Sequence, residues 1–131
     1  MKFVATLSTL IFLLTSCALF EPTASEKFIT APDTSTEALF TCAEAAISAL
    51  HKESAQWRLD VTSRNLQNGL FETNNFKDSN ITGIRAQIKY NKASNTGSIT
   101  VKASGPYFVD LGADHAATTL KYEIIQCMAP N

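Results

Sequence analysis

The segment "TSTEALFTCAEAAISALHKES", residues 34–54, combines the signals of an amphipathic helix with a cysteine. Thr34 and Glu37 have the spacing of a capping box, and Ser35 or Thr36 is an alternative N-cap. Behind them, apolar residues recur at spacings of three and four along one helical face: Leu39, Cys42, Ala43, Ala46, Ala49 and Leu50. The segment therefore predicts a helix that buries Cys42 early in its length.

Downstream of this helix, four segments alternate apolar and polar residues, which is the period of a strand with one buried face. They are WRLDVTS (57–63), the weaker LFETNNF (70–76), ITGIRAQIKY (81–90) and SITVKA (98–103). The positions expected to face inward are Trp57, Leu59, Val61, Ile84, Ala86, Ile88, Tyr90, Ile99, Val101 and Ala103. Four antiparallel strands in sequence order are the simplest arrangement of these segments.

The last segment, "SGPYFVDLGADHAATTLKYEIIQCMAPN" (104–131), predicts a second helix. Gly105 and Pro106 break the preceding strand, and Asp110 is the expected N-cap. Helical spacing then recurs in a second apolar stripe: Ala113, Ala117, Leu120, Ile124, Cys127 and Met128. Cys127 is thus expected on a buried face at the end of its helix.

The N-terminus predicts export and a lipid anchor. Lys2 precedes an uncharged, largely apolar stretch from Phe3 to Leu14; as a helix it covers roughly 18 Å, less than the ~30 Å core of a bilayer, so a signal peptide is favoured over a membrane span. The tetrapeptide Leu14-Thr15-Ser16-Cys17 resembles the bacterial lipobox, whose cysteine is diacylated and becomes the new N-terminus. Ala18 resembles the residue that sorts Gram-negative lipoproteins to the outer membrane. An ordinary signal peptide that contains a cysteine is the alternative.

The remaining two cysteines predict the topology. Exported chains meet an oxidising compartment, so Cys42 and Cys127 are expected to form a disulfide once Cys17 carries lipid, with two free buried thiols as the alternative. A disulfide requires Cα atoms within about 7 Å. Four intervening strands make the two helices antiparallel and bring the cysteines together, whereas three would leave them roughly 15 Å apart. We therefore predict an α+β fold, α-β-β-β-β-α, with both helices on one face of a four-stranded antiparallel sheet.

Length and composition predict one domain. The 131 residues, 45% of them apolar, are enough for a single core. The expected regions are a signal peptide (1–16), a lipidated N-terminus with a flexible tether (17–33) and one α+β domain (34–131). A formal charge of −1, from 11 basic and 12 acidic side chains without long runs, excludes the basic footprint of a nucleic-acid-binding protein.

Few residues suggest catalysis. Walker, dinucleotide-binding and Cys-x-x-Cys motifs are absent from the sequence, so we expect no cofactor. Asp110, Asp114 and His115 suggest a metal site. Asp110 and His115 together suggest the catalytic residues of a hydrolase. Helix capping explains Asp110, and the helix dipole explains Asp114 and, near the end of the first helix, His51. We accordingly expect no catalytic residue and no metal.

The polar face of the predicted sheet is the main candidate for binding. Its positions are Arg58, Asp60, Thr62, Arg85, Gln87, Lys89, Ser98, Thr100 and Lys102. Because basic residues exceed acidic ones, this face suits an acidic protein surface or lipid head groups, and a merely solvated face is the alternative. The candidate interaction residues are Arg58, Arg85, Gln87, Lys89 and Lys102.

From Trp57 onward, the order of the motifs W-R-L-D-V, F-K-D-S-N-I and S-I-T-V-K-A-S-G-P-Y-F-V-D-L-G resembles a bacterial family of unknown function. The positions that match its Phe-x-Asp turn, terminal strand Ser and Asp-Leu-Gly run are Phe76, Asp78, Ser104, Asp110, Leu111 and Gly112. The chain departs from that family at Lys102-Ala103, where Arg-Ser is usual, and in lacking basic residues after Asp-Leu-Gly. Similar helix, sheet, helix lipoproteins include accessory subunits of outer-membrane assembly machines, and neither resemblance implies an established activity.

These features together predict an envelope lipoprotein, anchored in the outer membrane by acyl chains and facing the periplasm. The expected role is non-enzymatic binding of an envelope protein through the polar sheet face or an exposed sheet edge. One alternative is a carrier of a lipid or other apolar ligand in a groove lined by Phe71, Phe76, Tyr107 and Phe108. The other is a hydrolase or metal enzyme that uses Asp110 and His115.

Overall fold

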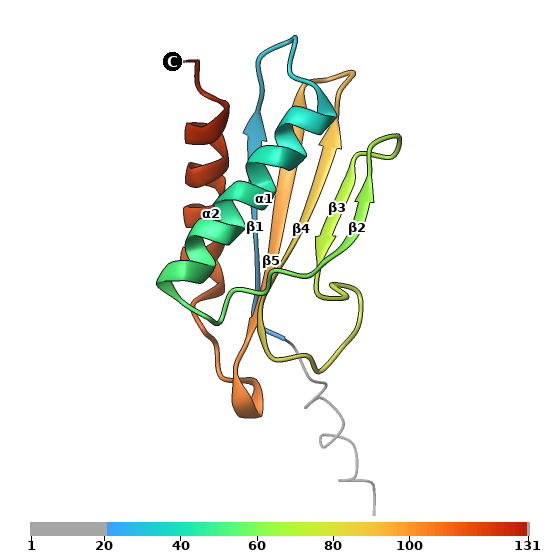
Figure 1. Ribbon diagram of the computed structural model, residues 1–131. Coiled ribbons are helices and arrows are strands. Elements are labelled where there is room, and N and C mark those ends of the chain that lie inside the picture. Colours follow the sequence, from blue (N-terminus) through green and yellow to red (C-terminus); the bar gives the residue numbers. More distant parts are fainter. Residues whose placement is uncertain (1–20, 131) are drawn as a thin grey trace, which may run out of the picture.

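A computed structural model describes residues 21–130 and shows an α+β fold with two helices and a five-stranded antiparallel sheet (Figure 1). In chain order the elements are β1 (Thr23–Ile29), α1 (Thr36–Glu53), β2 (Val61–Asn65), β3 (Leu70–Thr73), β4 (Gly83–Asn91), β5 (Thr96–Ser104), a 3-10 turn η1 (Pro106–Phe108) and α2 (Ala113–Met128). The spatial order of the strands is β1-β5-β4-β3-β2. The four strands between the helices therefore form the expected meander.

The prediction of four strands is wrong by one, because residues 23–29 of the expected flexible tether form β1. This strand pairs with β5 along its whole length, from Thr23 opposite Lys102 to Ile29 opposite Thr96. Its period was obscured by Glu26, which occupies an inward position between Ala24 and Phe28. The carboxylate is accommodated there because Lys121 of α2 donates to it at 3.1 Å.

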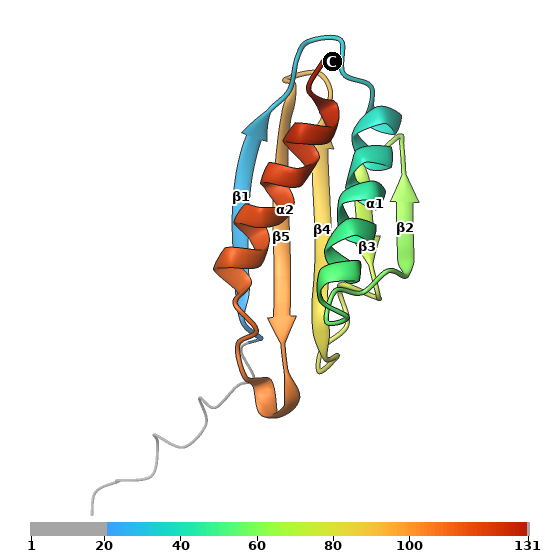
Figure 2. The same ribbon diagram turned by 60° about the vertical axis from the view of Figure 1, so that its left-hand side comes forward.

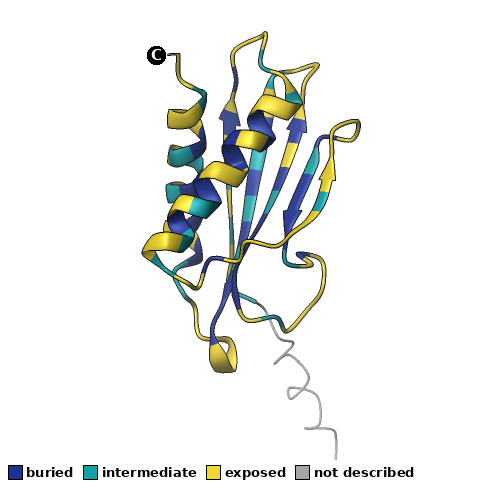
Figure 3. Ribbon diagram, viewed as in Figure 1, coloured by how far each residue is buried: buried dark blue, intermediate teal, exposed yellow. Residues whose placement is uncertain are grey.

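Both helices cover the same face of the sheet, with α2 over β1 and β5 and α1 toward β3 and β4 (Figures 1 and 2). Phe40 of α1 packs against Phe71 of β3, with ring centroids 5.5 Å apart. The burial pattern follows this two-layer arrangement (Figure 3). The fully buried apolar side chains between the layers include Leu39, Phe40, Phe71, Ile88, Ile99, Val101, Leu120 and Ile124. Hydrophobic burial between one helical layer and one sheet face thus supplies the core.

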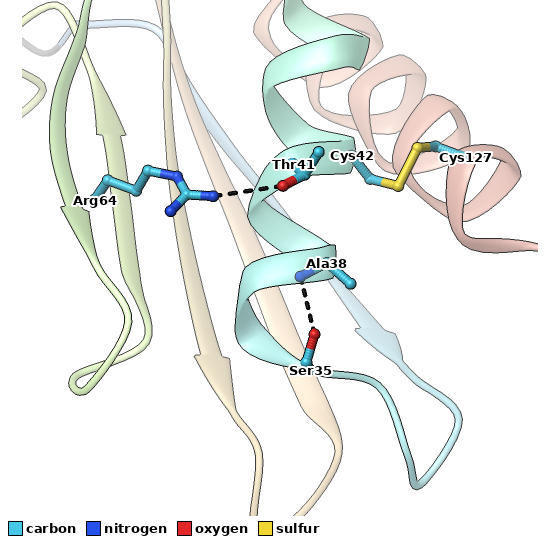
Figure 4. The surroundings of a disulfide bond; sticks show 6 residues. All are labelled: Ser35, Ala38, Thr41, Cys42, Arg64 and Cys127. Carbon is cyan, nitrogen blue, oxygen red and sulfur yellow. Dashed lines mark hydrogen bonds between the residues drawn. A yellow bond between two sulfur atoms is a disulfide. The ribbon is translucent and has the colours of Figure 1, made fainter.

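The predicted disulfide is confirmed and joins the two helices. Cys42 and Cys127 are bonded, 85 residues apart in sequence, with their Cα atoms 5.6 Å apart. Figure 4 shows the bond crossing between α1 and α2, near the N-cap of α1, where the Ser35 hydroxyl accepts a hydrogen bond from the Ala38 amide at 3.0 Å. Cys127 is exposed, not buried as predicted, because its side chain points toward α1 and not toward the sheet.

The first predicted strand, 57–63, is also corrected. Trp57 is buried and forms only an isolated bridge with Ile84, and the regular strand begins at Val61. Leu59 and Val61, expected inside, are 47% and 42% exposed. The cause is the position of β2 at the sheet edge, where it pairs with β3 alone and its register shifts between Val61 and Ser63.

Candidate functional site

The sheet surface opposite the two helices, called the open face below, carries most of the predicted binding residues. The register of β4 with β5 places Arg85 beside Lys102, Gln87 beside Thr100 and Lys89 beside Ser98. Strand β1 extends these rows, with Ser25 opposite Thr100 and Lys27 opposite Ser98. The open face is therefore a polar surface that spans β1, β5, β4 and β3.

One end of the open face is closed by the segment between β3 and β4, and its centre is Arg85. This guanidinium is fully buried. Its Nη2 donates to both carboxylate oxygens of Glu21 at 2.9 Å, while its Nη1 donates to the backbone carbonyls of Asn75, Phe76 and Asp78 at 3.0, 3.3 and 3.1 Å. The carboxylate and the three carbonyls satisfy both terminal nitrogens of this buried guanidinium, which stabilises its charge away from water.

Lys102 and Glu21 complete this closed end. The Lys102 ammonium donates to the Phe76 carbonyl at 2.6 Å and lies 4.7 Å from the centroid of the Phe76 ring. It is also 3.5 Å from the Glu21 carboxylate, which in addition accepts from the Asn80 amide at 2.9 Å. These contacts fix Glu21, at the start of the described chain, to the sheet and to the 74–80 segment.

The structure therefore separates the five predicted interaction residues. Arg85 is inaccessible, and Lys102 is mostly covered by its contacts with Phe76 and Glu21. Arg58 lies outside the strands and donates to the Thr82 carbonyl at 3.2 Å. Of the other two, Gln87 donates to Glu72 at 2.8 Å, and Lys89 is exposed.

Lys89 borders an open depression of about 880 Å³ on the open face, which extends from Lys77, beside the closed end, to Ile29 and Thr96 at the other end. Its lining is Lys27, Phe28, Ile29, Asn68, Leu70, Lys77, Gln87, Lys89, Tyr90, Asn91, Thr96, Gly97 and Ser98. We call it the lysine depression after Lys27, Lys77 and Lys89, all of which are exposed. Because Lys27 and Lys89 are both register neighbours of Ser98, their backbones lie roughly 10 Å apart.

The charge of the lysine depression is largely uncompensated. Lys77 lies 3.8 Å from the Glu72 carboxylate. Within residues 21–130, Lys27 and Lys89 have no carboxylate within 4 Å. Exposed apolar surface from Ile29, together with half-buried Leu70, adjoins these ammonium groups. The depression thus offers cations beside apolar contacts, a combination suited to an anionic partner with some apolar surface.

Sequence reasoning missed Lys27, Lys77 and Glu21 as members of this face. Lys27 and Glu21 fall in the predicted tether, and Lys77 falls in the Phe-x-Asp turn that follows the weak strand of residues 70–76. The available signal was the alternation of Ala24 and Phe28 with polar neighbours, which is the period of a strand.

The candidate catalytic residues do not form a reactive pair. The prediction of Asp110 as the N-cap of α2 is wrong by two residues, because the N-cap is Gly112. Asp110 nevertheless accepts hydrogen bonds from the amides of Gly112 and Ala113 at 2.8 and 2.9 Å, so its carboxylate is engaged at the start of α2. His115 is exposed, and its only hydrogen-bond partner among the described residues is Thr119, at 3.5 Å. Within residues 21–130, no three His, Cys, Asp or Glu side chains are grouped as a metal site would require.

The residues proposed to line an apolar carrier groove lie in three separate places. Phe71 is in the core against Phe40, Phe76 lies over Lys102, and Tyr107 and Phe108 form the turn η1. A depression between α1 and β2 includes Phe71, but its volume is about 270 Å³, below the usual range for ligand pockets. The groove that the carrier hypothesis predicted from these residues is therefore not formed.

Comparisons with protein families, with curated proteins and with solved structures found no match for this chain. The resemblance based on Ser104 and the Asp110-Leu111-Gly112 run stays a prediction. Neither helix within residues 21–130 is long and apolar enough to span a membrane. Cys17, the signal peptide and the first residues of the expected tether lie outside the described residues.

Proposed function

We propose that this chain is a lipid-anchored envelope protein that binds an acidic protein partner at the lysine depression, without catalysing a reaction. The observation that carries the proposal is the pair Lys27 and Lys89, two exposed ammonium groups on a hollowed part of the sheet, neither of which has a carboxylate partner within residues 21–130. The two lysines flank the same residue of β5, so acidic groups on one partner surface can contact both ammonium groups.

The position of the lysine depression favours a protein over lipid head groups as the partner. Glu21 is held at the opposite end of the open face, and the proposed acylation site, Cys17, is four residues before it. Along β1, the four steps from Thr23 to Lys27 cover roughly 13 Å. A chain anchored near Glu21 therefore holds the depression away from the lipid surface and open to proteins of the periplasm.

Charge reversal on the open face tests this proposal. The anchored protein is captured from bacterial envelopes as the natural chain, as Lys27→Glu/Lys89→Glu and as the control Lys52→Glu/Lys92→Glu. The control makes the same change in net charge at two exposed lysines that do not line the depression. A recurrent acidic partner should be lost from the first variant, kept by the control, and weakened by added salt.

Equal recovery with both variants would reject the lysine depression as the binding site. A Cys17→Ala chain, assayed in parallel for acylation and for partner recovery, separates the anchor from the interaction. Loss of acylation with the partner retained would mean that binding does not depend on the lipid.

A further inference from the structure

An exposed apolar turn projects from the sheet between β5 and α2. Tyr107, Phe108 and Val109 are 98%, 38% and 58% exposed, and Pro106 before them is also exposed. Figure 1 shows this turn extending beyond the sheet and both helices, at the end where β1 begins. From Ala103 to Val109 the chain carries no charge, so burying the turn requires no desolvation of an ionised group.

The backbone holds this turn in a conformation that aromatic residues rarely adopt. Tyr107 and Phe108 have φ angles of 56° and 60°, in the left-handed region, where each non-glycine residue costs roughly 1–2 kcal/mol. The base of the turn is closed by the Gly105 amide, which donates to the Val109 carbonyl at 2.7 Å. A Cβ atom at Gly105 would lie 2.9 Å from the end of the Leu111 side chain and 3.2 Å from the Val109 carbonyl oxygen, so a larger residue there requires Leu111 to move. The fold thus accepts strain to present two aromatic rings to the outside.

The turn lies close to the point where the chain leaves the described structure. Ala103 donates to the Pro22 carbonyl at 2.9 Å, so Glu21 and Pro22 lie beside the end of β5, which leads directly into the turn. Glu21 is fixed there by Arg85. Covalent geometry allows the four residue steps from Cys17 to Glu21 to span at most ~14 Å.

We propose that the turn formed by Pro106, Tyr107, Phe108 and Val109 enters the interfacial region of the membrane and orients the domain on it. The proposal rests on the proposed acylation of Cys17, which brings this end of the domain within ~14 Å of the lipid. Tyrosine and phenylalanine suit this depth, because their rings are apolar and the tyrosine hydroxyl can reach water. The acyl chains supply permanent attachment, and the turn fixes which end of the domain faces the lipid.

Fluorescence quenching by brominated lipid tests the insertion. The full-length acylated protein is reconstituted in phosphatidylcholine vesicles, with or without bromine on the acyl chains near the carbonyl groups. Phe108→Trp places the reporter in the turn, and Tyr122→Trp, at an exposed aromatic position roughly 14 Å along α2 from its start, is the matched control. The natural protein gives the background from Trp57, which is buried. If Phe108→Trp does not fold, Tyr107→Trp gives the same readout.

In brominated vesicles the fluorescence of Phe108→Trp should fall by roughly half or more, because interfacial side chains lie ~5–10 Å into the lipid boundary. The fluorescence of Tyr122→Trp should not change. Unchanged fluorescence of both turn variants, in protein whose intact mass shows an acylated Cys17, would overturn the insertion and leave the anchor standing. Equal quenching of the turn and of Tyr122→Trp would also overturn it, because the domain would then lie on its side. Quenching of the turn in protein that was purified from the bacterial envelope, and whose intact mass shows no acyl group on Cys17, would support insertion and reject the proposed anchor.

Discussion

Glu21→Ala is expected to destabilise the domain far more than its place at the end of the described chain suggests. The substitution removes both carboxylate oxygens that accept from Arg85, each at 2.9 Å, and leaves the buried guanidinium with only carbonyl acceptors on Nη1. Among the described residues, 21–130, the Arg85 Nε already has no hydrogen-bond partner. Removing one member of a buried ion pair typically costs 3–5 kcal/mol. The expected loss in the free energy of unfolding is therefore about 4 kcal/mol.

Urea unfolding of the full-length protein measures this loss, with Trp57 fluorescence as the signal. Trp57 is the single tryptophan and is buried, so its emission reports the loss of the core. For a denaturant dependence of about 1.5 kcal/mol per molar, typical of a small domain, the midpoint should fall by about 2–3 M. Glu26→Ala is the matched control on the same strand, because the Glu26 pair with Lys121 is about one-third exposed and should contribute less than about 1 kcal/mol.

A double-mutant cycle assigns the loss to the ion pair. Arg85→Met alone leaves the Glu21 carboxylate buried with Lys102, 3.5 Å away, as its remaining charge partner. The double variant Glu21→Ala/Arg85→Met should therefore lose less than the sum of the single losses, by about 2 kcal/mol. If Glu21→Ala lowers the free energy of unfolding no more than Glu26→Ala does, then Arg85 does not bind Glu21 when the protein is in solution. The short connection to Cys17, and the orientation inferred from it, would then be refuted together.

Two further predictions concern the links that hold the outer elements to the sheet. The Cys42–Cys127 bond closes a loop of 85 residues, so its reduction should lower the free energy of unfolding by about 4.5 kcal/mol in the chain-entropy model. In calorimetry the melting temperature should fall by roughly 20 °C. An unchanged melting temperature would mean that the packing of α1 on α2 is sufficient without the bond. Gly97→Ala should lower the free energy of unfolding by about 1–3 kcal/mol in urea, because its Cβ would lie 2.2 Å from the Phe28 ring and push β1 off β5. A loss of stability no greater than that of Thr96→Ala would contradict the pairing of β1 with β5.

The interior of the fold followed from the sequence because each element there has one dominant driving force. The stripe through Leu39, Cys42 and Ala46 gave α1, the alternation from Ile84 to Tyr90 gave β4, and the geometric limits of a disulfide gave the relative direction of the helices. These signals report burial against a neighbouring layer. Burial is the largest favourable term in folding, and it recurs with the period of the element.

The edges of the sheet and the binding surface did not follow, because they depend on contacts between residues far apart in the chain. Glu26 occupies an inward position of β1, where Lys121 of α2, 95 residues later in the chain, donates a hydrogen bond to its carboxylate. Arg85 alternates like a solvent-facing residue, yet Glu21 and the 74–80 segment bury it. Alternation alone places such a residue on the open face without revealing what covers it.

The corrected first strand changes what the proposed lipid anchor would do. A flexible tether of residues 17–33 would reach roughly 50 Å and leave the domain free to turn. With β1 starting at Thr23 and Glu21 fixed to Arg85, the same acyl chains would hold one end of the sheet against the lipid, with the apolar turn around Phe108 beside them. In that proposed orientation the lysine depression would lie farther from the lipid than the turn does, and a partner in the periplasm would bind it there. The proposed orientation by the turn and the proposed binding by the lysines use different parts of the sheet, so each proposal can fail its own experiment without the other.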